Sequence, residues 1–369
     1  MTSRVQAAAH YGAPIGALVV GAALSLLDLH DAVHSALLGA LVYAVAGAIL
    51  LFTVFVVLEH AESIAHRIGE PYGTLLLTVA VTTIEVSIIV SLMLQGKNNP
   101  TLARESVFST VMIVSAGLVG VCLTFGSWRH GYQELKRQGT SALLSVLVAL
   151  SILTLVLPNY TLTTAPGTFS VAQLAFVSVL AVLLYAGFVF AQTIGHRNDF
   201  VEDLVARSEI LPHPPRHGSL VVSFLLLFAG LGGVVLLAEY VASGVEHGLA
   251  ASGVQQVDAI IGALIAALVL LPEGVSAIRA AWNNELQRSL NIALGSACAT
   301  IGLTIPTVAL VSMLSGRELR LGLGQGDSVL LFLTLGVSVL SFGTGRTIVL
   351  TGLVHLVVFV AYLLLIVVP

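Results

Sequence analysis

Charged residues are scarce in this sequence. Only 9% of its 369 residues are Asp, Glu, Lys or Arg, whereas soluble globular domains contain about 25%. The hydrophobic share is 57% and the mean hydropathy is +1.01. This composition excludes a water-soluble fold, and we expect a polytopic membrane protein surrounded by the lipid bilayer.

Cysteine is nearly absent, and so are the motifs of several enzyme classes. Cys122 and Cys298 both lie in apolar stretches, so they form neither a disulfide framework nor a metal pattern. No G-x-x-x-x-G-K-[ST] motif is present, and His60 and His66 lack the H-E-x-x-H order of zinc enzymes. We expect a protein that is not an enzyme, holds no cofactor and has no nucleic-acid partner.

Long apolar runs recur along nearly the whole chain. Each has roughly 18 to 25 residues, enough to cross about 30 Å of hydrocarbon. We expect an all-α membrane fold of about eleven transmembrane helices, the first of them a retained helix rather than a signal peptide. They lie near 12–29, 36–58, 71–95, 105–127, 140–158, 169–192, 218–241, 256–279, 289–314, 327–344 and 347–368.

The distribution of Lys and Arg predicts the orientation of these helices. Basic residues accumulate in cytoplasmic loops. With the N-terminus in the cytoplasm, eleven of the fifteen Lys and Arg residues fall inside. The other four, Lys97, Arg104, Arg317 and Arg320, fall outside. An odd number of helices then places the C-terminus outside.

The least apolar connection divides the chain into two halves of five helices each. An odd number of helices per half makes the second half enter the membrane the other way up, which gives an inverted repeat. The predicted parts are an N-terminal transmembrane helix at 1–30, a first five-helix repeat at 31–194, a cytoplasmic acidic and proline-rich linker at 195–217, and a second five-helix repeat at 218–369.

Two glutamates stand deep inside apolar stretches. Glu85 lies in V-T-T-I-E-V-S and Glu273 in L-L-P-E-G-V-S. A carboxylate in hydrocarbon costs several kcal/mol unless it faces a cavity or a partner, so such an acid indicates function. Each glutamate falls in the second helix of its half, which predicts one site built from both repeats. The alternative for each is a structural carboxyl that is protonated and hydrogen-bonded to a neighbouring helix.

Oxygen-bearing groups accompany both glutamates. Thr74, Thr78, Thr82 and Glu85 follow at spacings that place them on one helical face. Pro272 lacks an amide hydrogen, so we expect a kinked or broken helix whose freed carbonyls suit a hard cation. Hydroxyls in such helices also serve helix–helix packing. The candidate supporting oxygens are Thr82, Thr83, Ser87, Ser276 and Ser296 and the backbone carbonyls of Leu268 and Leu271.

Three segments resemble a known transporter family. They are E-H-A-E-S-I-A-H-R-I-G-E-P-Y-G-T-L-L-L-T-V-A-V-T-T-I-E-V-S at 59–87, L-L-P-E-G-V-S-A-I-R-A-A-W-N-N-E-L-Q-R-S-L-N-I-A-L-G-S at 270–296, and F-G-T-G-R-T-I-V-L-T-G-L-V-H-L at 342–356. They are similar to the cation/proton exchangers (CAX) of the calcium/cation antiporter superfamily. The closest likeness is to the bacterial inner-membrane branch of calcium/proton and sodium- or potassium/proton antiporters.

The resemblance implies a fold and a set of site residues. The fold is an N-terminal helix followed by two inverted five-helix repeats, and the central carboxylates correspond to Glu85 and Glu273. Ser296 matches a small polar position in the helix that follows. The calcium exchangers have a G-N-A-x-E pattern, and this chain has no Asn just before either glutamate.

These patterns together predict a secondary antiporter that works by alternating access. Glu85 and Glu273 would bind a cation and protons in turn, with Ca²⁺ first and Na⁺ or K⁺ second among the cations. The alternatives are a Na⁺ or K⁺/proton antiporter without Ca²⁺ transport and a cation channel with an acidic pore ring. Oligomerisation is not indicated.

Residues with weaker signals lie at the cytoplasmic side and in the last helix. Glu59, Glu62 and Glu70 are candidates for recruiting cations from the cytoplasm, and a solvated juxtamembrane face is the simpler interpretation. His355 lies within the last apolar stretch. It serves either as a proton relay or as a hydrogen-bonded core histidine.

Overall fold

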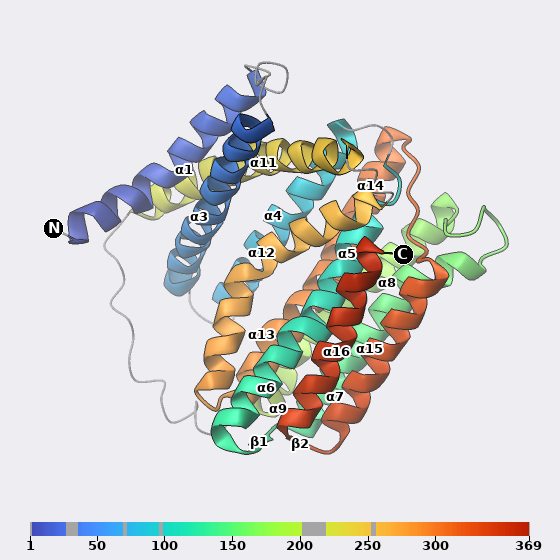
Figure 1. The fold of residues 1–369 in the computed structure, drawn as a ribbon. Coiled ribbons are helices and arrows are strands. Elements are labelled where there is room, and N and C mark those ends of the chain that lie inside the picture. The colour runs from blue at the N-terminus through green and yellow to red at the C-terminus, as the bar shows by residue number, and fades with distance from the viewer. Residues whose placement is uncertain are drawn as a thin grey trace. The chain divides into compact units, whose positions relative to one another are not determined.

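The computed structural model describes residues 2–26, 36–68, 72–95, 99–200, 219–251 and 256–368. Nearly all of these residues are helical (Figure 1). The N-terminal helix is α1 (Thr2–Leu26), and the helices of the first half are α3 (Ala36–Ile68), α4 (Tyr72–Gln95), α5 (Leu102–Met112), η1 (Ile113–Leu118), α6 (Val119–His130), α7 (Arg137–Ser151), η2 (Ile152–Val156), η3 (Leu157–Tyr160), α8 (Val171–Phe190), η4 (Ala191–Gly195) and α9 (Arg197–Phe200). Those of the second half are α11 (Leu220–Ala251), α12 (Val257–Trp282), α13 (Leu286–Ala299), η5 (Thr300–Thr304), α14 (Ile305–Ser315), α15 (Gln325–Gly343) and α16 (Val349–Val367).

The helices have the length and composition that membrane spans require. Within the described residues, nine helices could cross a membrane, and two shorter apolar helices cover His10–Leu26 and Thr78–Leu94. These eleven segments fall on the eleven ranges expected from hydropathy. The prediction of an all-α membrane fold with about eleven transmembrane helices is therefore confirmed.

The chain forms two compact units, each drawn from both halves of the sequence. Unit 1 consists of Met1–Gln95 with Pro212–Val257, and unit 2 of Gly96–Leu211 with Asp258–Pro369. Packing therefore does not follow the order of the chain.

Unit 1 is a bundle in which α11 packs against α1, α3 and α4. Glycines on α11 allow its neighbours to approach closely, as small residues do between membrane helices. A Cβ on Gly233 would lie 2.6 Å from the backbone nitrogen of Leu18 in α1, and Gly244 lies under the ring of Tyr43 in α3. The internal segments outside the described part are 27–35, 69–71, 96–98, 201–218 and 252–255. Glu70, Lys97 and most of the predicted linker lie in them.

Unit 2 has a reciprocal packing pattern. The third helix of each half is long and contains a π-helical segment in its middle, η1 in α5–η1–α6 and η5 in α13–η5–α14. The first of these helices packs against α15 and α16, and the second packs against α7 and α8. The third helix of one half is thus held by the last two helices of the other half.

Small residues make these contacts close. Gly117 in η1 faces the ring of Phe359 in α16, at 3.1 Å from the position of a Cβ. Gly302 in η5 faces Tyr185 in α8, at 2.6 Å. A glycine within each π-helical segment therefore lies against an aromatic side chain from the last helix of the other half.

The two ends of unit 2 are closed by different loops. At one end, the antiparallel strands β1 (Gln133–Glu134) and β2 (Arg346–Thr347) join the α6–α7 and α15–α16 connections. At the opposite end, the α14–α15 connection donates backbone hydrogen bonds from Arg320 to Pro100 and from Leu321 to Gly167. Consecutive loops of unit 2 thus alternate between the β1–β2 end and the opposite end, as membrane-crossing helices require.

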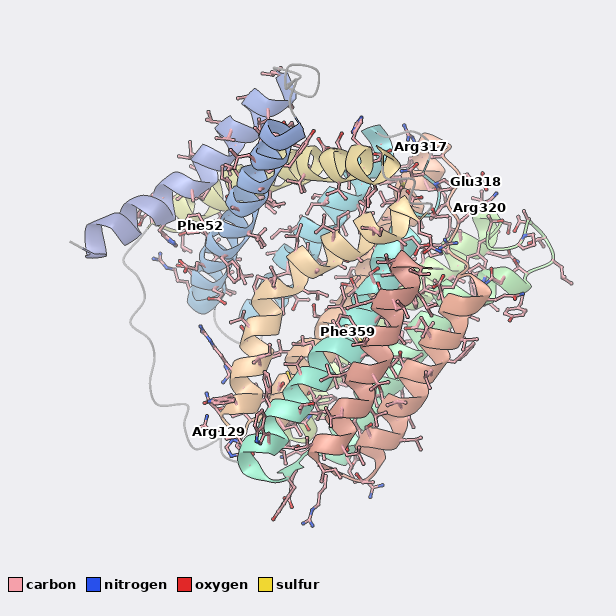
Figure 2. All side chains as sticks on the ribbon, viewed as in Figure 1. Phe52, Arg129, Arg317, Glu318, Arg320 and Phe359 are labelled. Atoms are coloured by element: carbon pink, nitrogen blue, oxygen red, sulfur yellow. The ribbon has the colours of Figure 1, made fainter. Side chains whose placement is uncertain are left out.

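Basic residues of unit 2 divide between these two ends, and which end faces the cytoplasm stays a prediction. Figure 2 shows Arg129 at the β1–β2 end and Arg317 and Arg320 at the opposite end. Lys136, Arg137 and Arg346 also belong to the segments that join at the β1–β2 end, and Arg104 to the opposite end.

Candidate functional site

Glu85 lies in the second half of α4, a helix that packs against α3 and α11 within unit 1. Glu85 is 3% exposed and Thr82 is 6% exposed, so the two residues, three apart, share a buried face. Thr83 is exposed, and its hydroxyl donates to the carbonyl of Val79 at 2.6 Å in its own helix. Ser87 is partly buried. The structure therefore groups Thr82 with the carboxylate and turns Thr83 away from it.

Glu273 lies in α12, which continues without a break from Val257 to Trp282 through Pro272. Figure 1 shows α12 changing direction about midway along its length. The predicted alternatives were a kink and a break, and the structure has a bend in a continuous helix. A proline removes one backbone donor, and the turns on either side can still complete their own hydrogen bonds.

The residues around Glu273 differ in exposure. Glu273 and Leu268 are partly buried and Pro272 is buried, whereas Ser276 is exposed and Leu271 is 40% exposed. Burial of the predicted site residues therefore changes from one position to the next within about one turn of Pro272.

Contacts at three levels show how α12 lies beside α5–η1–α6. A Cβ on Gly262 would lie 2.7 Å from the backbone nitrogen of Ser106, and one on Gly274 would lie 3.8 Å from a methyl carbon of Leu118. Further along, the guanidinium of Arg129 lies 4.7 Å from the ring of Trp282. These contacts run in parallel register, so Glu273 lies at the level of the π-helical segment η1.

The π-helical segments are a feature that the sequence did not predict. Such bulges inside α-helices occur frequently at functional sites. In η5, Thr300 and Thr304 are buried, and Ser296 lies one turn earlier with partial exposure. Thr307 donates to the carbonyl of Leu303 at 2.8 Å in its own helix.

A network of amides closes the β1–β2 end. The side-chain amide of Gln133 donates to the carbonyl of Ala281 at 3.2 Å and to Oδ1 of Asn284 at 3.0 Å. Oε1 of Gln287 accepts from the backbone of Lys136 at 2.9 Å. These contacts fix the α12–α13 turn, where Asn284 has a φ of 66°. The signal in the sequence was the run of amides N-N-E-L-Q-R-S-L-N after the second glutamate.

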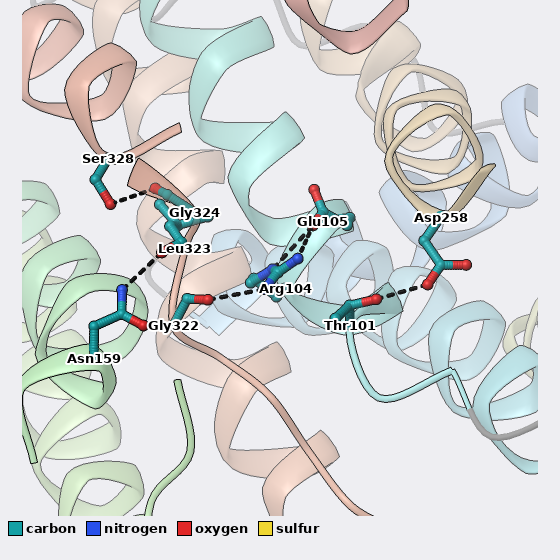
Figure 3. A network of polar contacts seen from close by, with 9 residues as sticks. All are labelled: Thr101, Arg104, Glu105, Asn159, Asp258, Gly322, Leu323, Gly324 and Ser328. Carbon is teal, nitrogen blue, oxygen red and sulfur yellow. Dashed lines mark hydrogen bonds and ion pairs between the residues drawn. The ribbon is translucent and has the colours of Figure 1, made fainter. Parts of the chain in front are cut away.

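A second network holds the opposite end (Figure 3). The guanidinium of Arg104 pairs with the buried carboxylate of Glu105 and donates to the carbonyl of Gly322 at 2.8 Å. Thr101 donates to Asp258 at 2.6 Å, which ties the start of α12 to the start of α5. The sequence predicted Arg104 outside the membrane and gave no sign of its acceptor Gly322, which lies 218 positions away in the chain.

The structure describes two of the three glutamates proposed to recruit cations. Glu59 is exposed, and its Oε2 lies 3.0 Å from Nδ1 of His10. Glu62 is also exposed, and Glu70 lies outside the described residues. Among the side chains that the structure describes, no group of three or more His, Cys, Asp or Glu residues is arranged to hold a metal ion.

Comparison with known proteins decides the family. The model of the family described as "Sodium/calcium exchanger protein" matches residues 37–194 and 222–368, which together make up most of the chain. The chain belongs to this sodium/calcium exchanger family. Each matched range lies within one of the two halves predicted from the sequence.

Curated members similar to this chain cover most of its length. The chain is 44% identical to the "Putative ionic transporter y4hA" of Sinorhizobium fredii over 325 residues, 88% of each protein. It is 37% identical to the "Sodium-potassium/proton antiporter ChaA" of Escherichia coli over 319 residues, 85% of this chain and 86% of ChaA. These relatives agree with the predicted family.

Solved structures of the exchanger family have the same fold. Native YfkE superposes with a TM-score of 0.69 over 96% of this chain and 99% of its own, at 16% identity. The H⁺/Ca²⁺ exchanger CAX gives a TM-score of 0.65 over 95% of this chain and 87% of its own, at 16% identity. The likeness confirms the predicted fold, which is an N-terminal helix followed by two inverted five-helix repeats. The boundaries of the repeats stay a prediction.

Proposed function

We propose that this exchanger-family chain is a secondary antiporter that moves a hard inorganic cation against protons by alternating access. The observation that carries the proposal is the pair Glu85 and Glu273. Each lies in the second helix of its half, Glu85 fully buried and Glu273 partly buried. Two carboxylates in otherwise apolar spans need compensation, because burial in a low-dielectric medium disfavours an isolated charge.

Two kinds of ligand supply that compensation. A cation can bind the carboxylate oxygens, or protons can neutralise them when the cation leaves. Because both ligands use the same oxygens, occupancy by one excludes the other, and movement of the cation becomes coupled to movement of protons. Thr82 shares the buried face of Glu85 and is positioned to add a further oxygen to the cation.

Ca²⁺ is the first candidate cation, with Na⁺ and K⁺ as further substrates. Carboxylate, hydroxyl and carbonyl oxygens suit hard cations, and Ca²⁺ takes about 6–8 of them. Exchange of Na⁺ or K⁺ without Ca²⁺ is the second candidate function. It is supported by the 37% identical relative named as a sodium-potassium/proton antiporter. It is also supported by the segments before each glutamate, which offer no side-chain amide oxygen.

The proposed location is the bacterial inner membrane, with the N-terminus and the β1–β2 end of unit 2 in the cytoplasm and the C-terminus outside. Support comes from the segregation of basic residues between the two ends of unit 2. Arg129, Lys136, Arg137 and Arg346 gather at the β1–β2 end, and cytoplasmic loops carry the excess of Lys and Arg.

The test is flux through the purified protein in liposomes. A pH gradient imposed across the membrane should drive uptake of labelled Ca²⁺, and of Na⁺ or K⁺ in parallel vesicles, beyond equilibrium. Competition by excess unlabelled Na⁺ or K⁺ against Ca²⁺ then separates the two candidate functions. A channel would give unitary currents in planar bilayers and no uphill transport. Vesicles in which no cation gradient responds to the pH gradient would contradict the proposal.

A further inference from the structure

His355 is a buried histidine that makes two hydrogen bonds within unit 2. It lies in α16 and is 1% exposed. Its Nδ1 lies 2.8 Å from the backbone carbonyl oxygen of Ser115, and its Nε2 lies 3.1 Å from the hydroxyl of Ser341 in α15. A carbonyl oxygen can only accept, so Nδ1 carries the hydrogen. In the neutral imidazole, Nε2 then accepts from Ser341.

The carbonyl that His355 contacts belongs to the π-helical segment η1. The backbone amide of Val119, which would bond Ser115 in a regular α-helix, donates instead to Ala116 and Val114. The carbonyl of Ser115 thus receives no hydrogen bond from the backbone amide four residues later. A buried carbonyl needs a partner, since leaving it unpaired costs the free energy of its lost hydration. The imidazole of His355 donates the hydrogen bond that this carbonyl would accept from the backbone in a regular α-helix.

The same segment lies beside the second glutamate of the proposed site. Leu118, the last residue of η1, is the neighbour of Gly274, at 3.8 Å from the position of a Cβ there. The register of α12 along α5–η1–α6 puts Glu273 at the level of Gly117. The segment η1 and the part of α12 that carries the carboxylate therefore lie beside each other.

The histidine has no equivalent on the other half. In α16, His355 precedes the aromatic residue packed on Gly117, Phe359, by four positions. In α8, the aromatic residue packed on Gly302 is Tyr185, and four positions before it stands Ala181. The arrangement of glycine, aromatic ring and π-helical segment is shared by both halves, and the imidazole donor is present in one.

We propose that His355 is a positioning residue of the exchange site. Its Nδ1 hydrogen holds the Ser115 carbonyl and fixes the bulge in α5–η1–α6, the helix beside which α12 carries Glu273. The inference rests on the proposed function of that glutamate. It assigns His355 the role of a permanent donor, in contrast to a relay that takes up and releases the transported protons.

Three variants in proteoliposomes test the role. His355→Leu removes the donor, His355→Asn keeps an amide donor near the position of Nδ1, and Ser341→Ala removes the other partner. We expect His355→Leu to raise the KM for the cation roughly tenfold, as loss of a buried hydrogen bond of about 1.4 kcal/mol would. His355→Asn should restore a KM within about twofold of the parent, with the same pH profile, and Ser341→Ala should behave like the parent.

The controls separate this role from folding and from the proposed function. Size-exclusion profile and thermal stability are measured on each variant, and KM is compared on equal amounts of folded protein. An unchanged KM in folded His355→Leu would overturn the proposal. A shifted pH profile or a loss of exchange in His355→Asn would also overturn the proposal, because either result is expected of a proton relay. If His355→Leu does not fold, the His355→Asn variant alone tests the role. Failure of the antiport function itself would appear in the unmodified protein.

Discussion

Nδ1 of His355 lies 2.8 Å from the carbonyl oxygen of Ser115 and joins the last helix of the second half to the third helix of the first. Seven residues further along α16, the hydroxyl of Tyr362 donates to Ser109 at 2.7 Å. Both polar bonds lie between the same two helices. They fix the rotation of α16 on α5–η1–α6, the helix along which α12 carries Glu273.

Gly262 allows α12 and α5 to touch. A Cβ there would lie 2.7 Å from the backbone nitrogen of Ser106 and 2.8 Å from the backbone carbon of Glu105. Since backbone atoms cannot turn aside, Gly262→Ala should lower stability by about 1–3 kcal/mol, the usual cost of overpacking. The measurement is the thermal unfolding midpoint in detergent.

Gly336→Ala is the matched control for this substitution. Gly336 lies within α15, and no atom lies within 4 Å of the position of its Cβ. Its unfolding midpoint should equal that of the parent. Equal midpoints for both variants would show that α12 does not pack on α5 at Gly262.

Arg104 compensates a buried carboxylate. Glu105 is 7% exposed, and Asp258 and Asp327 are near enough to interact with it electrostatically. Arg104→Met leaves Glu105 without its cation, and breaking such a pair costs on the order of 3 kcal/mol. Arg104→Met with Glu105→Gln removes both charges and should recover most of the lost thermal stability. A double variant no more stable than Arg104→Met would contradict the pairing shown in Figure 3.

The orientation predicts opposite labelling of two exposed glutamates. Glu134, at the β1–β2 end, has a side chain 63% exposed, and Glu318, at the opposite end, has one 48% exposed. Each is replaced by cysteine in a chain without Cys122 and Cys298. A membrane-impermeant maleimide applied to intact cells should label Glu318→Cys, and should label Glu134→Cys only after permeabilisation. The reverse pattern would invert the proposed topology.

Hydropathy predicted the helices well because each span must be apolar over its full length. The predicted range 140–158 became Arg137–Tyr160, and 256–279 became Val257–Trp282. Charge counting predicted which loops share a side of the membrane, and the loops of unit 2 divide between its two ends in the same grouping. Which end faces the cytoplasm stays a prediction. Such properties depend on local composition and do not require knowledge of which helices touch.

Features that depend on tertiary contacts could not be predicted from the sequence. The π-helical segment around Ser115 depends on a donor 240 positions away, and the partners of Arg104 lie both next to it and 218 positions away. Pro272 shows the limit of a local rule, because its helix bends and continues. For the candidate site, the burial of Glu85 followed from its apolar surroundings. The different exposure of Thr82 and Thr83 depended on how α4 packs.

Proton-driven cation flux in proteoliposomes containing Glu85→Gln or Glu273→Gln tests the antiport mechanism most directly. Glutamine keeps the size of the side chain and removes its charge and its titration, so each variant should lose coupled uptake of Ca²⁺, Na⁺ and K⁺ to the level of empty vesicles. Glu134→Gln, on the exposed β1–β2 end, is the control and should transport like the parent. Full exchange by either Glu85→Gln or Glu273→Gln would contradict the mechanism.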